Sequence, residues 1–160
     1  MDRKATVISN AVWLLVTVLL SSAALITLMV LTRRVKSGHS NKLMTAGFVL
    51  SIASVIAATL IPEASPKGQR LLLNPTDGMD ELQAPGNVVL FIPLGGFLRL
   101  AGISRPKTML LAMAFSIAIE MVQFFLIQGR SASTGDVILN TTGALVGHVI
   151  AGHSQSTRQP

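Results

Sequence analysis

Long uncharged apolar runs constrain the fold of this chain more than any other feature of its sequence. Five of them occur, at about residues 9–32, 43–61, 87–101, 108–127 and 137–151. An α-helix needs about 20 apolar residues to cross the hydrocarbon core of a bilayer, and the first, second and fourth runs approach or exceed that length. The third and fifth runs have about 15 residues, a length that also suits buried or re-entrant helices.

Composition supports a membrane environment. Only 12% of the 160 residues are charged, and mean hydropathy is +0.60, whereas soluble domains carry about 25% charged residues. Because charges and loops alternate consistently around all five runs, we interpret each run as a span. The sequence predicts an all-α, polytopic membrane helix bundle with about five transmembrane helices. Residues 1–42 would form an N-terminal transmembrane helix and inner loop, residues 43–152 a four-helix membrane core, and residues 153–160 a disordered tail.

Basic residues at the ends of the runs predict the orientation. Three of them follow the first run as in a stop-transfer signal, so we interpret that run as a retained span and not as a signal peptide. With an external N-terminus, the inner set is Arg33, Arg34, Lys36, Lys42, Arg99, Arg105, Lys107 and Arg158, and the outer set is Arg3, Lys4, Lys67, Arg70 and Arg130. The larger inner set predicts a multi-pass protein of the cell membrane with its N-terminus outside and its C-terminus in the cytoplasm.

Several classes of site and partner are disfavoured by the residue types present. The formal net charge is +6, but the basic residues lie between apolar runs, and one Trp and no Tyr leave little aromatic surface for stacking bases. The absence of Cys excludes disulfides, zinc–thiolate sites and thiol catalysis. The three histidines lie away from the intramembrane acid. We therefore expect no nucleic-acid partner, no cofactor and no metal site.

The one long connection, residues 63–86, would lie outside. Pro66, Pro75 and Pro85 argue against a regular helix through it. Asp77, Asp80 and Glu81 lack the spacing of an EF-hand, so we interpret them as part of a solvated loop.

Polar residues inside the apolar runs are the most informative for function. A carboxylate such as Glu120 at the centre of a membrane costs at least about 2.5–3.5 kcal/mol, so it must face the bundle interior, be protonated or find a partner. Ser116, Glu120 and Gln123 follow helical spacing and share one face. Asp136 and Asn140 repeat the pattern in the next run.

Small residues and helix rise predict how these groups meet. Gly143 and Gly147 form a small-xxx-small motif on the stripe of Asn140, which allows close helix approach. At about 1.5 Å per residue, Glu120 lies about 12 Å, and Asn140 about 7 Å, inside the outer ends of their helices. Asn87 begins the third run at the same level. The polar groups should therefore converge on the outer half of the membrane, with nothing comparable in the inner half.

Three motifs together resemble the VanZ-like family. They are residues 87–95 (NVVLFIPLG), 116–123 (SIAIEMVQ) and 129–147 (GRSASTGDVILNTTGALVG). The resemblance covers roughly residues 62–147, and the first span looks like an N-terminal extension. It implies a small polytopic bacterial membrane protein, and the family's namesake is linked to resistance to the glycopeptide teicoplanin. The family residues that carry over are Asn87, Pro93, Gly95, Glu120, Gln123, Arg130, Asp136, Asn140 and Gly143. Many members carry a further acid between positions 130 and 136, which this chain lacks.

Two functions of different class are compatible with these residues. The first is a non-enzymatic binder whose outward-facing polar notch holds an envelope lipid, a lipid-linked precursor or a lipophilic glycopeptide. Its ligand-binding residues would be Asn87, Glu120, Gln123, Arg130, Asp136 and Asn140. The alternative is an intramembrane enzyme on similar substrates, with Glu120 as general acid or base and Asp136 as a second, ionised acid.

Structural roles stay open beside both functions. Asn87 and Gln123 could act only as polar links between helices. Arg130 and Asp136 could form an ion pair that closes their loop. Transport and the oligomeric state also stay open.

Overall fold

The fold is a bundle of five helices in the part of the chain that the structure describes, and the computed structural model describes residues 3–34, 40–59, 70–76, 83–126 and 131–156. In chain order the elements are α1 (Arg3–Arg34), α2 (Ser40–Thr59), β1 (Leu71–Leu72), α3 (Gln83–Leu100), α4 (Arg105–Leu126), β2 (Ala132–Ser133) and α5 (Thr134–Ser156). The prediction of an all-helical chain with five helices is confirmed.

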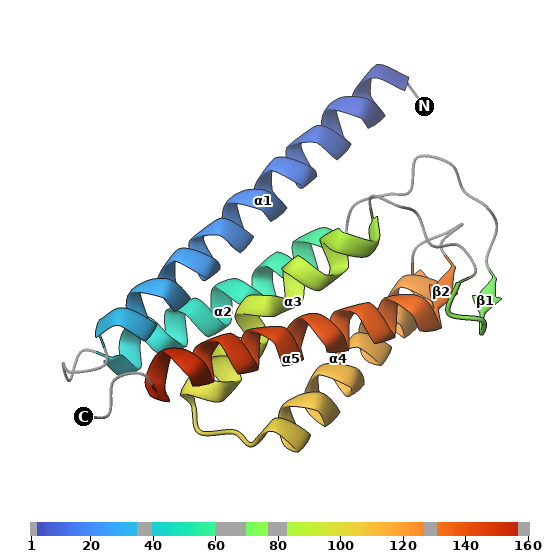
Figure 1. Cartoon of the computed structure of the whole chain (residues 1–160). Helices are drawn as coiled ribbons and strands as arrows, with labels where there is room; N and C mark the ends of the chain where they lie inside the picture. Colours follow the sequence, from blue (N-terminus) through green and yellow to red (C-terminus); the bar gives the residue numbers. More distant parts are fainter. Residues whose placement is uncertain (1–2, 35–39, 60–69, 77–82, 127–130, 157–160) are drawn as a thin grey trace.

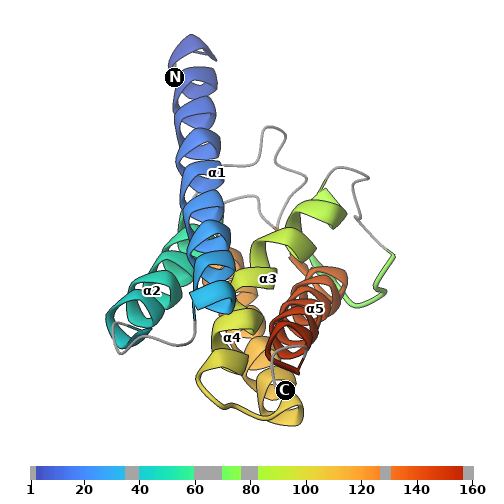
Figure 2. The ribbon, with the colours of Figure 1, turned by 60° about the vertical axis from the view of Figure 1, so that its left-hand side comes forward.

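Each helix runs antiparallel to the one before it in the chain, so the two termini lie at opposite ends of the bundle (Figure 1). We call the end where α3 and α5 begin and α4 ends the β end, because it carries the two short strands, and the opposite end the C-terminal end. Figure 2 shows α3 between the α1–α2 pair and α5. This central position explains why α3 supplies two buried rings. Phe91 packs in one cluster with Val55 of α2 and Ala144 of α5, and Phe97 packs in a second cluster with Leu28 of α1.

Helices α3 and α5 are longer than the apolar runs predicted. Helix α3 begins at Gln83, so the expectation of no regular helix through residue 86 is wrong for residues 83–86. Pro85 fits there because the N–H groups of a first helical turn have no intrahelical acceptor, and proline lacks that N–H. Helix α5 ends at Ser156, so residues 153–156 are helical and not part of a disordered tail. At 18 and 23 residues, these helices extend about 27 and 35 Å.

Among the described residues, a single helix is both long enough and apolar enough to cross a membrane on its own. It is α4, Arg105–Leu126. Shorter apolar stretches occur at Leu15–Val30, Lys42–Ala58 and Ala84–Leu100. Polar side chains interrupt the apolar character of α5, and these are the residues that build the site described below.

Glycines bring the backbones of α3 and α5 into direct contact. A Cβ atom added at Gly143 or Gly147 would collide with the carbonyl oxygen of Val88 or Ile92, and one at Gly95 would collide with the carbonyl oxygen of Ala144. The prediction that the small-residue stripe of α5 packs against protein is therefore confirmed. Because only glycine permits this approach, the stripe fixes how α5 sits on α3.

A short parallel strand pair closes the β end and was not predicted from the sequence. Leu71 pairs with Ala132 and Leu72 with Ser133. The backbone N–H of Ala132 also donates to the carbonyl oxygen of Arg70 at 3.0 Å. The pair ties the connection before α3 to the residues just before α5, and so positions Ser133 above the end of α4.

Candidate functional site

One face of α4 carries buried polar side chains. Ser116 is fully buried, and Glu120 and Gln123 are only 6% and 5% exposed. Ile117 and Met121, on the other side of the same helix, are exposed. The carboxyl group of Glu120 therefore faces protein, which is the arrangement that the cost of a lipid-exposed acid requires.

The carboxylate of Glu120 meets the start of α5. The backbone N–H of Ser133 donates to Glu120 Oε2 at 2.9 Å, and this N–H belongs to the residue just before the first residue of α5, Thr134. The first N–H groups of a helix have no intrahelical acceptor, and the helix dipole places partial positive charge there. Glu120 is thus held by a backbone donor and by the positive end of a helix.

A second hydrogen bond joins α4 to α5 one helical turn away. Asn140 Nδ2 donates to Ser116 Oγ at 2.8 Å, and both residues are buried. The other side-chain atom, Asn140 Oδ1, is also buried and has no hydrogen-bond partner among the described residues. Asn140 therefore keeps an acceptor that this network does not use.

Helix α3 joins the cluster through Asn87. Its Nδ2 donates to Asp136 Oδ1 at 2.7 Å. Asp136 lies in the first turn of α5, where a negative charge interacts favourably with the helix dipole. The Arg130–Asp136 ion pair suggested by the sequence lies outside the described residues, because the structure does not describe Arg130.

The described polar groups form one set at the β end, which we call the outer cluster. Its members are Asn87, Ser116, Glu120, Gln123, Ser133, Asp136 and Asn140. Helical spacing alone predicted the shared faces, but the backbone of Ser133 carried no sequence signal. The strand pair places it there.

Comparison with protein-family models shows the family of the chain. A model described as VanZ/LLP1 matches residues 6–153, nearly the whole chain. The chain belongs to the VanZ/LLP1 family. No curated protein and no solved structure matches. The resemblance in the motifs is confirmed, and the match also includes most of α1, which the motifs had left outside.

A second polar group of this VanZ/LLP1-family chain lies at the C-terminal end. Thr108 Oγ1 lies 3.0 Å from His148 Nδ1, and both residues are buried. Arg99, Arg105 and His153 lie nearby, around a hollow that also borders His148. The expectation that the other half of the bundle holds nothing comparable is wrong.

Helical spacing contained the signal for this second group. Counting back from Ser116 in fours reaches Ala112 and Thr108, and these three residues are all buried on one face of α4. Counting forward from Asn140 in fours reaches Ala144 and His148, which are also buried. The spacing that places Ser116 and Asn140 on buried faces thus also places Thr108 and His148 there.

The described acids and histidines of this family member do not gather into a metal site. No group of three or more His, Cys, Asp or Glu side chains that could hold a metal ion occurs among the residues whose positions are described. His148, the histidine placed most deeply, pairs with Thr108 at the end opposite Glu120. The chemistry that this chain's own residues offer at the outer cluster is hydrogen bonding and charge.

Proposed function

We propose that this chain is a multi-pass protein of the cell membrane that binds a lipid-linked envelope precursor, or a lipophilic glycopeptide such as teicoplanin, at the outer cluster. The observation that carries the proposal is a set of buried polar side chains on facing helices, Glu120 and Asn140 above all, inside a bundle of mainly apolar helices. Intramembrane polar groups are costly. A role in recognition explains why several are gathered at one end.

Exposed apolar side chains support placement in a membrane. Only 22% of the 18-residue apolar stretch of α4 is buried inside the protein, whereas the core helix of a soluble protein would be mostly buried. The exposed large hydrophobic residues on the five helices include Leu15, Leu19, Ile26, Val49, Ile56, Val89, Leu110, Phe125, Ile138 and Ile150. Membership in the VanZ/LLP1 family agrees with a membrane location.

The outer cluster offers complementary groups to a polar head group. Asn140 Oδ1 can accept a hydrogen bond from a hydroxyl or amide, because it has no hydrogen-bond partner among the described residues. Glu120 adds a carboxylate, and Arg130 lies between α4 and α5 in the sequence. A guanidinium binds phosphate or carboxylate through paired N–H groups, so we assign Arg130 to an anionic group of the ligand.

An exposed apolar edge beside the outer cluster suits the lipid tail. Leu71 and Leu73 are exposed at the strand pair, and Phe125 and Leu126 are exposed at the end of α4. Strand β1 pairs with β2, and Ser133 of β2 donates to Glu120. A ligand with a polar head and a long apolar tail would therefore find both kinds of surface at this end.

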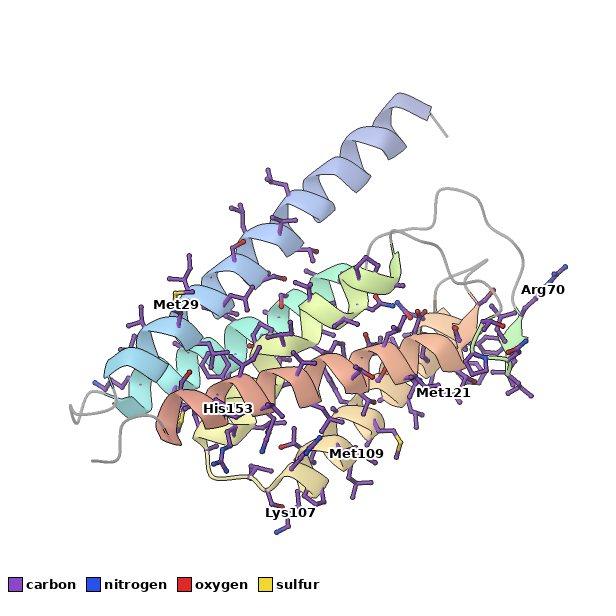
Figure 3. The ribbon with its side chains drawn as sticks, in the orientation of Figure 1. Met29, Arg70, Lys107, Met109, Met121 and His153 are labelled. Atoms are coloured by element: carbon purple, nitrogen blue, oxygen red, sulfur yellow. The ribbon has the colours of Figure 1, made fainter. Side chains whose placement is uncertain are left out.

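Removing the arginine tests the proposed head-group contact. We expect Arg130→Ala to lower the amount of co-purified lipid about tenfold in native mass spectrometry, since a charge-assisted hydrogen bond contributes about 1.5–3 kcal/mol. Arg70→Ala is the matched control, because Arg70 is exposed at the same end of the bundle (Figure 3). Equal lipid profiles for wild type and Arg130→Ala would reject the head-group role.

Orientation can be measured because the chain has no native cysteine. Thr76 at the β end and Lys107 at the C-terminal end are both exposed. We expect a membrane-impermeant maleimide to label Thr76→Cys in intact cells, and to label Lys107→Cys only after permeabilisation. The excess of basic residues at the C-terminal end is the physical reason. Reversed labelling would contradict the orientation, and labelling of both in intact cells would contradict a spanning bundle.

A further inference from the structure

A basic hollow lies at the C-terminal end of the bundle, far from the outer cluster. It measures about 450 Å³ and lies between the end of α3, the start of α4 and the last turns of α5. Its lining residues are Arg99, Arg105, His148, Val149, Gly152 and His153. Figure 3 shows His153 near the end of α5 at this end of the bundle. Four of the six lining residues are thus arginine or histidine.

Arg99 reaches this hollow from the last turn of α3. Its guanidinium lies against α5, because a Cβ atom added at Gly152 would stand 3.2 Å from Arg99 Nε. Arg99 Nε is buried and has no hydrogen-bond partner among the described residues. A buried N–H donor of this kind is normally paired. The Arg99 side chain therefore has a buried N–H donor that can still accept a hydrogen-bonding partner.

No Asp or Glu side chain lies near this hollow in the part of the chain that the structure describes. The seven acids of the chain are Asp2, Glu63, Asp77, Asp80, Glu81, Glu120 and Asp136. None lies in residues 3–62, 82–119 or 137–160, the segments that include α1, α2, α3, the start of α4 and nearly all of α5. The described acids, Glu120 and Asp136, lie at the opposite end of the bundle and so do not balance the charge of Arg99 and Arg105.

We infer that this hollow binds the phosphate of an anionic phospholipid head group at the inner surface of the membrane. The inference rests on the membrane placement under the proposed function, but not on the ligand of the outer cluster. Guanidinium groups bind phosphate oxygens through two parallel hydrogen bonds. Basic pockets between transmembrane helices on the cytoplasmic side commonly bind anionic head groups.

One further feature favours a lipid over a free anion, and another favours an anion of either kind. The hollow opens beside apolar side chains, since Val149 lines it and Val149 and Ile150 are exposed on α5, so acyl chains can continue along that helix. The start of α4 also lies here, and the N-terminus of a 22-residue helix attracts negative charge. The hollow thus combines cationic donors with an adjacent apolar surface.

Charge removal at the hollow tests the inference on the full chain in detergent. Binding of phosphatidylglycerol is measured by native mass spectrometry, with phosphatidylcholine as the zwitterionic comparison. Wild type is expected to bind phosphatidylglycerol at least fivefold more tightly than phosphatidylcholine. Arg105→Gln and Arg99→Gln are each expected to remove most of this preference. Lys107→Gln, an equal loss of charge at an exposed position of α4 outside the lining, is expected to change affinity less than twofold.

Three outcomes would overturn the inference. The first is equal affinity of wild type for the two lipids. The second is an equal loss in Arg105→Gln and Lys107→Gln, because the attraction would then be unspecific. The third is thermal stabilisation by inorganic phosphate that Arg105→Gln abolishes, without any effect of phosphatidylglycerol, because the occupant would then be a soluble anion. Maleimide labelling at positions 76 and 107 separates these failures from a failure of the membrane placement.

Discussion

Changing Glu120 to glutamine is expected to leave the fold intact and to lower ligand binding at the outer cluster at least tenfold. Glutamine has nearly the same shape, and its side-chain oxygen can still accept the hydrogen bond from the backbone N–H of Ser133. The bond loses its charge assistance, worth about 1 kcal/mol, but the bundle no longer buries a carboxylate. The free energy of unfolding should therefore change by less than about 1 kcal/mol.

Glu120→Ala is the informative comparison. Alanine removes the acceptor and leaves the N–H of Ser133, a buried residue, without a partner. We expect this variant to lose about 1–3 kcal/mol of stability in addition to binding. Denaturant titration in detergent and lipid binding by native mass spectrometry would measure both variants. Normal binding by Glu120→Gln, together with unchanged turnover of a lipid-linked precursor, would show that Glu120 serves only to hold the start of α5.

The same variant separates a binder from an enzyme. If the chain acts on a lipid-linked precursor, Glu120→Gln abolishes turnover because the amide transfers no proton, while binding of the precursor survives. If the chain only binds, affinity itself falls. Glu120 is buried and Asp136 is half-buried, so the two acids have unlike environments. This is the observation that keeps the enzyme in consideration.

Replacing Gly143 with alanine is expected to destabilise the bundle by about 3 kcal/mol, at the upper end of the usual cost of overpacking. The added Cβ would collide with the carbonyl oxygen of Val88. A backbone atom of a packed helix cannot move aside as a flexible side chain can, so α3 and α5 must separate. Gly95→Ala should behave in the same way, because its Cβ would collide with the carbonyl oxygen of Ala144.

Gly86→Ala is the matched control for this prediction. Gly86 lies in the first turns of α3, and a Cβ atom added there meets nothing within 4 Å. Alanine is favoured over glycine in a helix by about 0.5–1 kcal/mol, so this variant should be slightly more stable than wild type. The midpoint of SDS-induced unfolding measures all three variants. Equal midpoints for Gly143→Ala and Gly86→Ala would contradict the close contact of α3 with α5.

Helix ends illustrate where prediction from the sequence stops. The apolar runs located all five helices, but the third and fifth were predicted to begin at Asn87 and Val137 and in fact begin at Gln83 and Thr134. A run ends where polar residues begin, whereas a helix continues for as long as its end groups find partners. At the start of α5 the N–H of Ser133 finds such a partner in Glu120, and in the first turn of α3 Pro85 has no N–H that needs one.

The basic hollow shows a different limit. The sequence indicates only that Arg99 and Arg105 flank spans and set orientation, and that His148 and His153 lie away from the intramembrane acid. Their sequence separation gives no indication that they all line one space. That arrangement depends on the rotation of α5 about its axis, which is set by the glycine contacts with α3.

The sequence by itself determined the five helices, the shared face of Ser116, Glu120 and Gln123, and the uneven distribution of charge between the two ends. These properties follow from the period of a single helix and from the order of residues along the chain. Only the tertiary structure decided that Glu120 meets the backbone of Ser133 and that glycines of α5 lie on carbonyl groups of α3. Such partners lie on different elements, so they depend on how those elements are rotated and spaced, which no local pattern encodes.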